Sequence, residues 1–242
     1  MEEPLLKMYM PLLLSLSSFA MAWHATSRAG ALERERERRA EAREQLAVLR
    51  RYHHPLLNAT FELQSRIFNI LRKDFLSVYM SQRGEAGRRY AVNSTLFVFG
   101  QFFGWMELIQ RDIQFLESEA DAQKAIALSR RMLELRRGLA SDRDTSPCRI
   151  FAFQQRAIGE RMIIASANGD TCMGYAKFCD MLDSDPAFAE EFTLLRQELE
   201  SFARAGSPSH RLTILHTHLI DLLEVLDRDF RHYPKEERQY LQ

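Results

Sequence analysis

Apolar residues recur at three- and four-residue steps along most of this chain, and this spacing predicts amphipathic helices. Near the C-terminus, five leucines form one stripe: Leu212, Leu215, Leu219, Leu222 and Leu226. The same period predicts helices over residues 56–80, 118–140, 154–167, 186–204 and 209–230. Residues 149–153 have some strand character but no partner strand. We therefore expect an all-α fold.

One helix is predicted to lie at the centre of the body. Residues 96–116 are apolar on nearly every side until Glu107, which is typical of a buried helix. Gly100 and Gly104, one turn apart, would let a neighbouring helix approach closely. A second membrane span is the alternative, although only the sixteen residues 91–106 are free of charge.

The N-terminal segment is suited to a membrane. Residues 8–27 contain no Lys, Arg, Asp or Glu, and a helix of that length rises about 30 Å, which matches the hydrocarbon core. Tyr9 and Trp23 lie near its ends, where aromatic side chains anchor at the interface. We predict a transmembrane anchor in residues 1–27. The alternatives are a cleaved signal peptide, because Ala20-Met21-Ala22 resembles a cleavage site, and a buried core helix.

A charged segment follows the apolar one. Residues 28–54 are rich in strong helix formers and predict a helical stalk, which His53-His54-Pro55 would end or redirect. Residues 28–51 hold eight Arg against five Glu, whereas two Glu and one Lys precede the apolar segment. This excess of Arg predicts a single-pass protein with a cytoplasmic body. A solvated spacer is favoured over a coiled coil because the heptad pattern is poor, with weak dimerisation or headgroup attraction as alternatives.

Composition excludes several classes of partner and site. The 33 Lys and Arg balance the 33 Asp and Glu, so no overall positive field favours nucleic acid. Cys148, Cys172 and Cys179 form no CxxC pair, which argues against a disulfide framework and a structural zinc site. His216 and His218, two residues apart on a helix, do not face each other. We therefore expect no metal and no cofactor.

No signature of catalysis occurs in the chain. His-Glu-x-x-His, Gly-x-Ser-x-Gly, Walker, dinucleotide-binding and Glu-x-x-His patterns are all missing from the sequence. Without a nucleophile beside a base, or a phosphate-binding loop, we assign no catalytic residue.

Two charged pairs are the candidate ligand-binding residues. Glu62 with Arg66, and Arg156 with Glu160, are spaced i,i+4 beside strongly apolar helix faces. Residues four apart meet on one helix face, so the structural interpretation is two partly buried salt bridges that fix helix register. The functional interpretation is that the pairs line a cleft and bind a polar ligand.

Four strings of this chain resemble recurrent segments of an uncharacterised family of membrane-anchored, all-helical proteins. They lie within residues 50–232 and read YHHPLLNATFELQSRIFNIL, QFFGWMELIQRDIQFL, QQRAIGERMI and RLTILHTHLIDLLEVLD. The resemblance implies an N-terminal apolar segment, a charged helix and a helical body, in that order. It implies no activity.

Three parts are therefore expected: an anchor in residues 1–27, a stalk in residues 28–54 and an irregular helical bundle in residues 55–242. The expected function is that of a non-enzymatic protein, held in the membrane by its N-terminal helix, which presents a cytoplasmic interaction domain to a protein partner or to a second copy of itself. The alternative is an enzyme or small-ligand sensor with a polar site between the body helices. A solvent-connected polar cavity would favour the alternative, and a sealed core the first.

Overall fold

A computed structural model describes residues 33–40, 51–113, 119–167, 169–205, 209–238 and 240–241. The chain divides into two compact units, Met1–Ala47 and Val48–Gln242. In the first unit, residues 33–40 form a helix with exposed side chains. The predicted anchor in residues 1–27 lies outside the described residues. Among the residues that are described, no helix is both long enough and apolar enough to span a bilayer.

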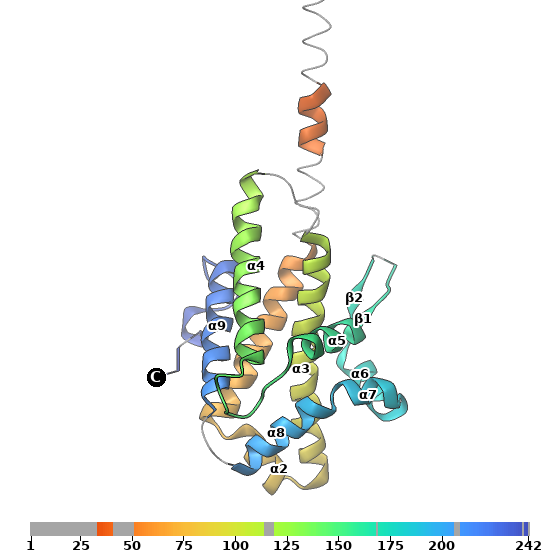
Figure 1. Ribbon diagram of the computed structural model, residues 1–242, viewed down its shortest axis with the longest axis vertical. Coiled ribbons are helices and arrows are strands. Elements are labelled where there is room, and N and C mark those ends of the chain that lie inside the picture. The colour runs from red at the N-terminus through yellow and green to blue at the C-terminus, as the bar shows by residue number, and fades with distance from the viewer. Residues whose placement is uncertain are drawn as a thin grey trace, which may run out of the picture. The chain divides into compact units, whose positions relative to one another are not determined.

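The second unit is predominantly helical, which confirms the expected fold class (Figure 1). A helix over residues 51–72, called helix 51–72 below, is followed by α2 (Phe75–Gln82), α3 (Gly84–Ile113), α4 (Glu119–Ala140), α5 (Ala152–Met162), α6 (Tyr175–Ser184), α7 (Pro186–Glu191), α8 (Thr193–Ala205) and α9 (His210–Leu226). A 3-10 helix, Lys235–Glu237, lies near the C-terminus. In the described ranges, only β1 (Ile163–Ile164) and β2 (Thr171–Cys172) are strands, and they pair antiparallel.

Helix α3 is the central helix, as its apolar sequence predicts. It contacts α2, α4, α5, α6 and α8, and its Phe99, Phe102 and Phe103 side chains are buried. The predicted leucine stripe is also buried, and it lies on α9, which packs against α4. Figure 1 shows that the axes of helix 51–72, α3, α4 and α9 are roughly aligned. Their apolar faces form the core of the unit.

Glycines allow α3 and α5 to cross closely. A Cβ atom on Gly104 would lie 3.0 Å from Met162 Cβ on α5 and 2.6 Å from the Cys172 sulfur on β2, and one on Gly159 would lie 2.8 Å from the Phe103 carbonyl oxygen. Because a side chain at either position would collide with its neighbour, these contacts require glycine. This confirms that Gly104 permits close approach of a neighbouring helix.

The predicted helix break at His53-His54-Pro55 is wrong, because residues 51–72 are continuously helical. Tyr52 is buried, and its ring centroid lies 6.2 Å from that of Trp105 on α3. The His53 imidazole lies 2.7 Å from the Leu226 carbonyl oxygen at the end of α9. These packing contacts outweigh the local preference of the residue before proline for an extended backbone.

Several predicted helices have different boundaries in the structure. The helix predicted over residues 56–80 is interrupted at Asp74, whose φ is 49°, and continues as α2. The helix predicted over residues 96–116 begins earlier, at Gly84. The helix predicted over residues 154–167 ends at Met162, where the hairpin of β1 and β2 begins. The helix predicted over residues 186–204 is divided at Phe192 into α7 and α8. The buried Phe192 ring packs against Phe178 at 5.1 Å, a tertiary contact that local periodicity does not reveal.

A buried arginine binds the main chain at the C-terminal end of α4. Arg211, at the start of α9, is 1 % exposed. Its guanidinium donates to main-chain carbonyl oxygens of Gly138, Leu139 and Ser141 at 3.1 Å each, of Ser146 at 3.4 Å, and of Asp144. The last carbonyls of a helix lack partners within that helix. Arg211 supplies donors for them and joins the end of α4 to α9.

A second buried arginine binds the main chain at the C-terminal end of α9. Arg238 pairs with the Asp227 carboxylate, and the two side chains are 1 % and 3 % exposed. Arg238 also donates to the carbonyl oxygens of Asp227 at 3.0 Å and of Tyr233 at 2.7 Å. Burial opposes ionisation of Asp227, but hydrogen bonds from backbone amides and from Arg238 outweigh it and lower its pKa. The C-terminal segment is thereby fixed to the end of α9.

One neutral polar pair lies inside the core. The Gln64 side-chain nitrogen is 2.8 Å from His216 Nε2, and both residues are buried. Burial, with a smaller contribution from the Arg72 charge, lowers the pKa of His216 to about 4. His216 is therefore neutral in the native protein at pH 7.

Replacement of Arg211 by Met is expected to destabilise the protein strongly. The variant leaves buried carbonyl oxygens without donors, which we expect to lower the free energy of unfolding by about 3 kcal/mol or more. Urea denaturation followed by circular dichroism measures this. The exposed Arg228, replaced by Met, is the control and should change stability by less than about 0.5 kcal/mol. A loss below about 1 kcal/mol in Arg211→Met would contradict the capping role.

Replacement of His216 by Gln should reduce the acid sensitivity of the fold. Between the usual pKa of 6.5 and the native value of about 4, the unfolded chain binds a proton that the native protein does not. Stability from this residue is complete above pH 6.5 and decreases as the pH falls to about 4. The wild-type protein should lose about 3 kcal/mol more than His216→Gln across that window. Parallel losses in urea titrations at pH 7 and pH 4.5 would show that His216 is not buried neutral.

Candidate functional site

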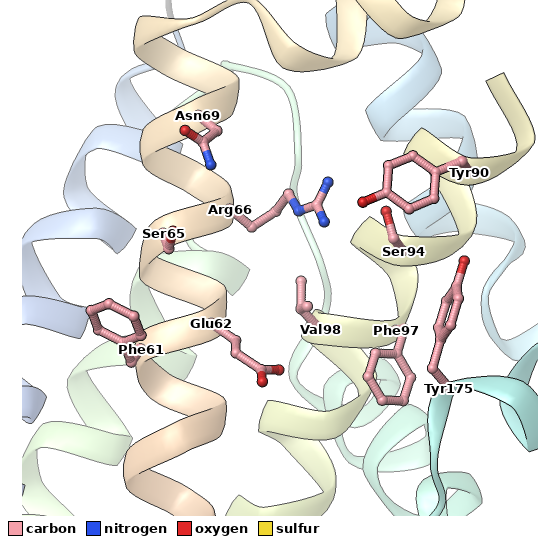
Figure 2. Close-up of a pocket in the computed structure, with 10 residues that line it drawn as sticks. All are labelled: Phe61, Glu62, Ser65, Arg66, Asn69, Tyr90, Ser94, Phe97, Val98 and Tyr175. Atoms are coloured by element: carbon pink, nitrogen blue, oxygen red, sulfur yellow. The ribbon is translucent and has the colours of Figure 1, made fainter. Parts of the chain in front are cut away.

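Glu62 and Arg66 line an open pocket between helix 51–72 and α3 (Figure 2). Its volume is about 370 Å³. The lining side chains are Phe61, Glu62, Ser65, Arg66 and Asn69 from helix 51–72, Tyr90, Ser94, Phe97 and Val98 from α3, and Tyr175 from α6. The first two groups recur at three- and four-residue steps, so each helix contributes one face. The pocket is therefore built by helical periodicity on two packed helices.

The Arg66 guanidinium has no carboxylate partner within 4.0 Å among the described residues. Its Cζ atom lies 4.2 Å from the centre of the Phe75 ring on α2. Figure 2 shows the guanidinium reaching from helix 51–72 toward Tyr90. Burial lowers the pKa of Arg66, and the nearby Tyr90 hydroxyl offsets this only in part. The pocket thus holds a positive charge with no described carboxylate at salt-bridge distance.

Glu62 lies at the exposed rim of the pocket, one helical turn from Arg66. Removal of its carboxyl from water raises its pKa, and the Arg66 charge compensates only in part. In the described part of the chain, Glu62 forms no ion pair with Arg66. Without a close salt bridge, the folded chain disfavours the charged form of both side chains.

Aromatic rings form the opposite wall. The Phe97 ring meets the Tyr175 ring edge-on at 5.3 Å, and the Tyr90 ring centroid lies 5.8 Å from that of Tyr79. Tyr90 and Tyr175 remain 47 % and 37 % exposed, so their rings are accessible from solvent. Burial, with a hydrogen bond to Cys179, raises the pKa of Tyr175 to about 12, and its phenol is neutral at pH 7. The wall is therefore aromatic, and the Tyr175 phenol in it carries no charge.

One buried hydroxyl at the pocket is unsatisfied. Ser94 is 7 % exposed, and its Oγ atom has no hydrogen-bond partner among the described residues. Figure 2 places Ser94 on α3 below Tyr90, across the pocket from Arg66. A buried polar group without a partner costs about 1–3 kcal/mol, which a ligand atom that accepts from it would recover.

Arg156 and Glu160 do not line the pocket that contains Arg66. On α5, Arg156 Nε lies 2.9 Å from Glu160 Oε1, and the side chains are 57 % and 58 % exposed. Arg156 also approaches Glu107 at 3.8 Å. The pair is a solvent-exposed salt bridge, the kind that contributes about 0–1 kcal/mol. The structure therefore separates the two charged pairs that the sequence presents as equivalent.

Sequence reasoning missed the residues on α3 and α6. Tyr90 and Ser94 lie in the polar first part of α3, before the apolar run that predicts the central helix, so periodicity gave no signal for them. Tyr175 had no signal either, because it reaches the pocket only through the packing of α6 against α3.

The pocket has the donors of an anion site and not the ligands of a metal site. Across the described ranges, no group of three or more His, Cys, Asp or Glu side chains is placed to hold a metal ion. Burial raises the pKa values of both the Cys148 and the Cys172 thiol to about 12, so both are neutral. Besides the Glu62 carboxyl at its rim, the pocket offers guanidinium, hydroxyl and amide groups to a ligand.

Replacement of Arg66 by Met should leave the fold intact. The folded chain disfavours the charged guanidinium, so an apolar side chain of similar length should keep the free energy of unfolding within about 0.5 kcal/mol or raise it by up to about 1 kcal/mol. Urea denaturation of Arg66→Met beside Arg211→Met tests this. A loss of 2 kcal/mol or more would show that Arg66 is needed for folding.

Comparison with models of known protein families, with curated proteins and with solved structures gave no match. The resemblance to an uncharacterised helical family stays a prediction. The interpretation of the pocket rests on the geometry of this chain.

Proposed function

We propose that this chain is a non-enzymatic, membrane-anchored protein whose helical body binds a small ligand in the pocket of Arg66. The observation that carries the proposal is the guanidinium of Arg66, held over Phe75 and facing an open cavity without a carboxylate partner among the described residues. Clefts lined by aromatic side chains with a few convergent polar groups are typical small-molecule sites.

The cavity favours ligand binding over a purely structural body. Two charged residues, Glu62 and Arg66, face an open pocket instead of a sealed core. Both pKa values are shifted against the charged form, a feature that clusters at functional sites. Folding alone does not require such a pair, because apolar residues at these positions would remove the desolvation cost.

A binding role suits the pocket better than catalysis. Ser94 carries the most buried hydroxyl of the pocket lining and would be the candidate nucleophile. No described base forms a hydrogen bond with it. Tyr175 is neutral at pH 7, because its pKa is about 12. A covalent mechanism needs a nucleophile activated by a neighbouring base or by a lowered pKa.

The proposal places the body on the cytoplasmic face of a membrane. Its support is the uncharged segment of residues 8–27 followed by eight Arg and five Glu in residues 28–51. Such flanks retain the basic side in the cytoplasm. A ligand-dependent body on this anchor would act as a sensor at the membrane surface, and its response would reach a protein partner or a second copy of the chain.

A ligand screen on the full chain tests this function. We expect the tagged protein in the membrane fraction and the chain lacking residues 1–27 in the soluble fraction. In detergent, some members of a metabolite library should raise the melting temperature by at least about 3 °C, because a ligand at 100 times its Kd adds about 2.7 kcal/mol to stability.

A pocket-filling variant provides the control for that screen. Ser65→Trp places a large ring in the cavity and should abolish the shifts, whereas Ser129→Trp, at an exposed position on α4, should keep them. Shifts that persist in Ser65→Trp, or a library that shifts neither wild-type protein nor Ser129→Trp, would refute the proposed ligand site. A wild-type protein that stays soluble on fractionation would refute the anchor.

A further inference from the structure

We infer that the pocket selects an organic monocarboxylate with a flat apolar body, and that its carboxylate binds Arg66. This inference rests on the proposed ligand-binding function and names the chemical class of the ligand. It is carried by the charge, the shape and the unsatisfied donors of the pocket.

The charge of the pocket limits the ligand to one negative group. Among the lining side chains, Arg66 is the one cation and Glu62 the one carboxyl. A ligand carboxylate would supply the partner that Arg66 lacks within 4.0 Å among the described residues. A second negative charge would approach Glu62 at the rim without a further cation to balance it. A dianion, such as a phosphate monoester, is therefore disfavoured relative to a carboxylate.

The orientation of Arg66 suits a carboxylate. The Phe75 ring covers one face of the guanidinium at 4.2 Å. This leaves the N–H edge to meet an acceptor in the plane of the group. Arginine binds carboxylates through two parallel hydrogen bonds from that edge.

The shape of the pocket suits a flat body. Its volume of about 370 Å³ lies near the lower end of small-molecule sites. The rings of Tyr90, Phe97 and Tyr175 face it from α3 and α6 (Figure 2). Tyr90 and Tyr175 are 47 % and 37 % exposed, so a ligand ring can pack against them at the 4.5–7 Å that is typical of aromatic pairs. A single ring attached to a carboxylate would fit between this wall and Arg66.

Unused hydrogen-bond donors complete the site. Ser94 Oγ has no partner in the described part of the chain, and the Asn69 amide lies on the same side of the pocket as Arg66. Either group can donate to a carboxylate oxygen. A neutral ligand would leave the positive charge of Arg66 without a partner.

Four probes with the same ring separate charge from shape. Phenylacetate, 2-phenylethanol, 2-phenylethylamine and phenyl phosphate are titrated into the full chain in detergent, and binding is measured by saturation-transfer NMR. Phenylacetate should bind at least about tenfold more tightly than the alcohol, since pairing a charge in a partly buried site is worth a kilocalorie or more. The amine and phenyl phosphate should bind more weakly than phenylacetate.

Three variants assign the effect to residues. In Arg66→Met, the affinity for phenylacetate should fall to that for 2-phenylethanol. Glu62→Gln should strengthen phenylacetate binding about threefold, because it removes a negative charge one turn from Arg66. If Glu62 instead held Arg66 in place, the same variant would weaken binding. Ser65→Trp should abolish binding of all four probes.

The outcomes separate this inference from the proposed function. Equal affinity for phenylacetate and the alcohol, tighter binding of phenyl phosphate, or an unchanged preference in Arg66→Met overturns the carboxylate assignment. The ligand site itself survives these results if Ser65→Trp abolishes binding. If none of the four probes binds, the metabolite library decides. The inference then requires that the library compounds whose binding is lost in Ser65→Trp are carboxylates, and neutral compounds in that group overturn it. If there are no such hits, both proposals fail.

Discussion

The fold of the second unit depends on buried guanidinium groups at the ends of its helices. Arg211 donates to the carbonyls at the end of α4, and Arg238 does the same at the end of α9. Arg211 joins elements distant in sequence, and Arg238 fixes the C-terminal segment that follows α9. In both cases a side chain from one segment satisfies the carbonyls of another. Hydrophobic stripes bring the helices together, but the direction in which the chain leaves α4 and α9 follows from these hydrogen bonds.

Arg66 differs from these two arginines in one respect that decides its interpretation. The terminal guanidinium nitrogens of Arg211 and Arg238 donate to backbone carbonyls or to Asp227, so most of the cost of burial is balanced inside the protein. Arg66 has an aromatic ring on one face and a phenol nearby, and the described residues offer it no carboxylate. The same side chain is a structural support where its donors are used and a binding group where they are not.

Much of the architecture follows from the sequence, and the exceptions have a common cause. The spacing of the leucine stripe predicts α9, and the unbroken apolar run predicts that α3 is central. Pro55 failed as a helix breaker because Tyr52 and His53 form tertiary contacts. Local preference decides boundaries only where packing does not oppose it.

The candidate site shows the same limit more sharply. Glu62 and Arg66 were identified from their spacing, yet the same spacing selected Arg156 and Glu160, which form an exposed salt bridge. Sequence spacing places side chains on one face of a helix but does not say what that face meets. Tyr175 could not be found at all, because its place depends on how α6 packs.

The hydrogen bond between Gln64 and His216 has a consequence for the opposite side of the same helix. It fixes the rotation of helix 51–72 about its axis against α9, at a buried position. Since Arg66 follows Gln64 by two residues, that rotation also sets the direction of the guanidinium. A ligand would therefore meet a preorganised cation and would lose little affinity to rearrangement of the protein.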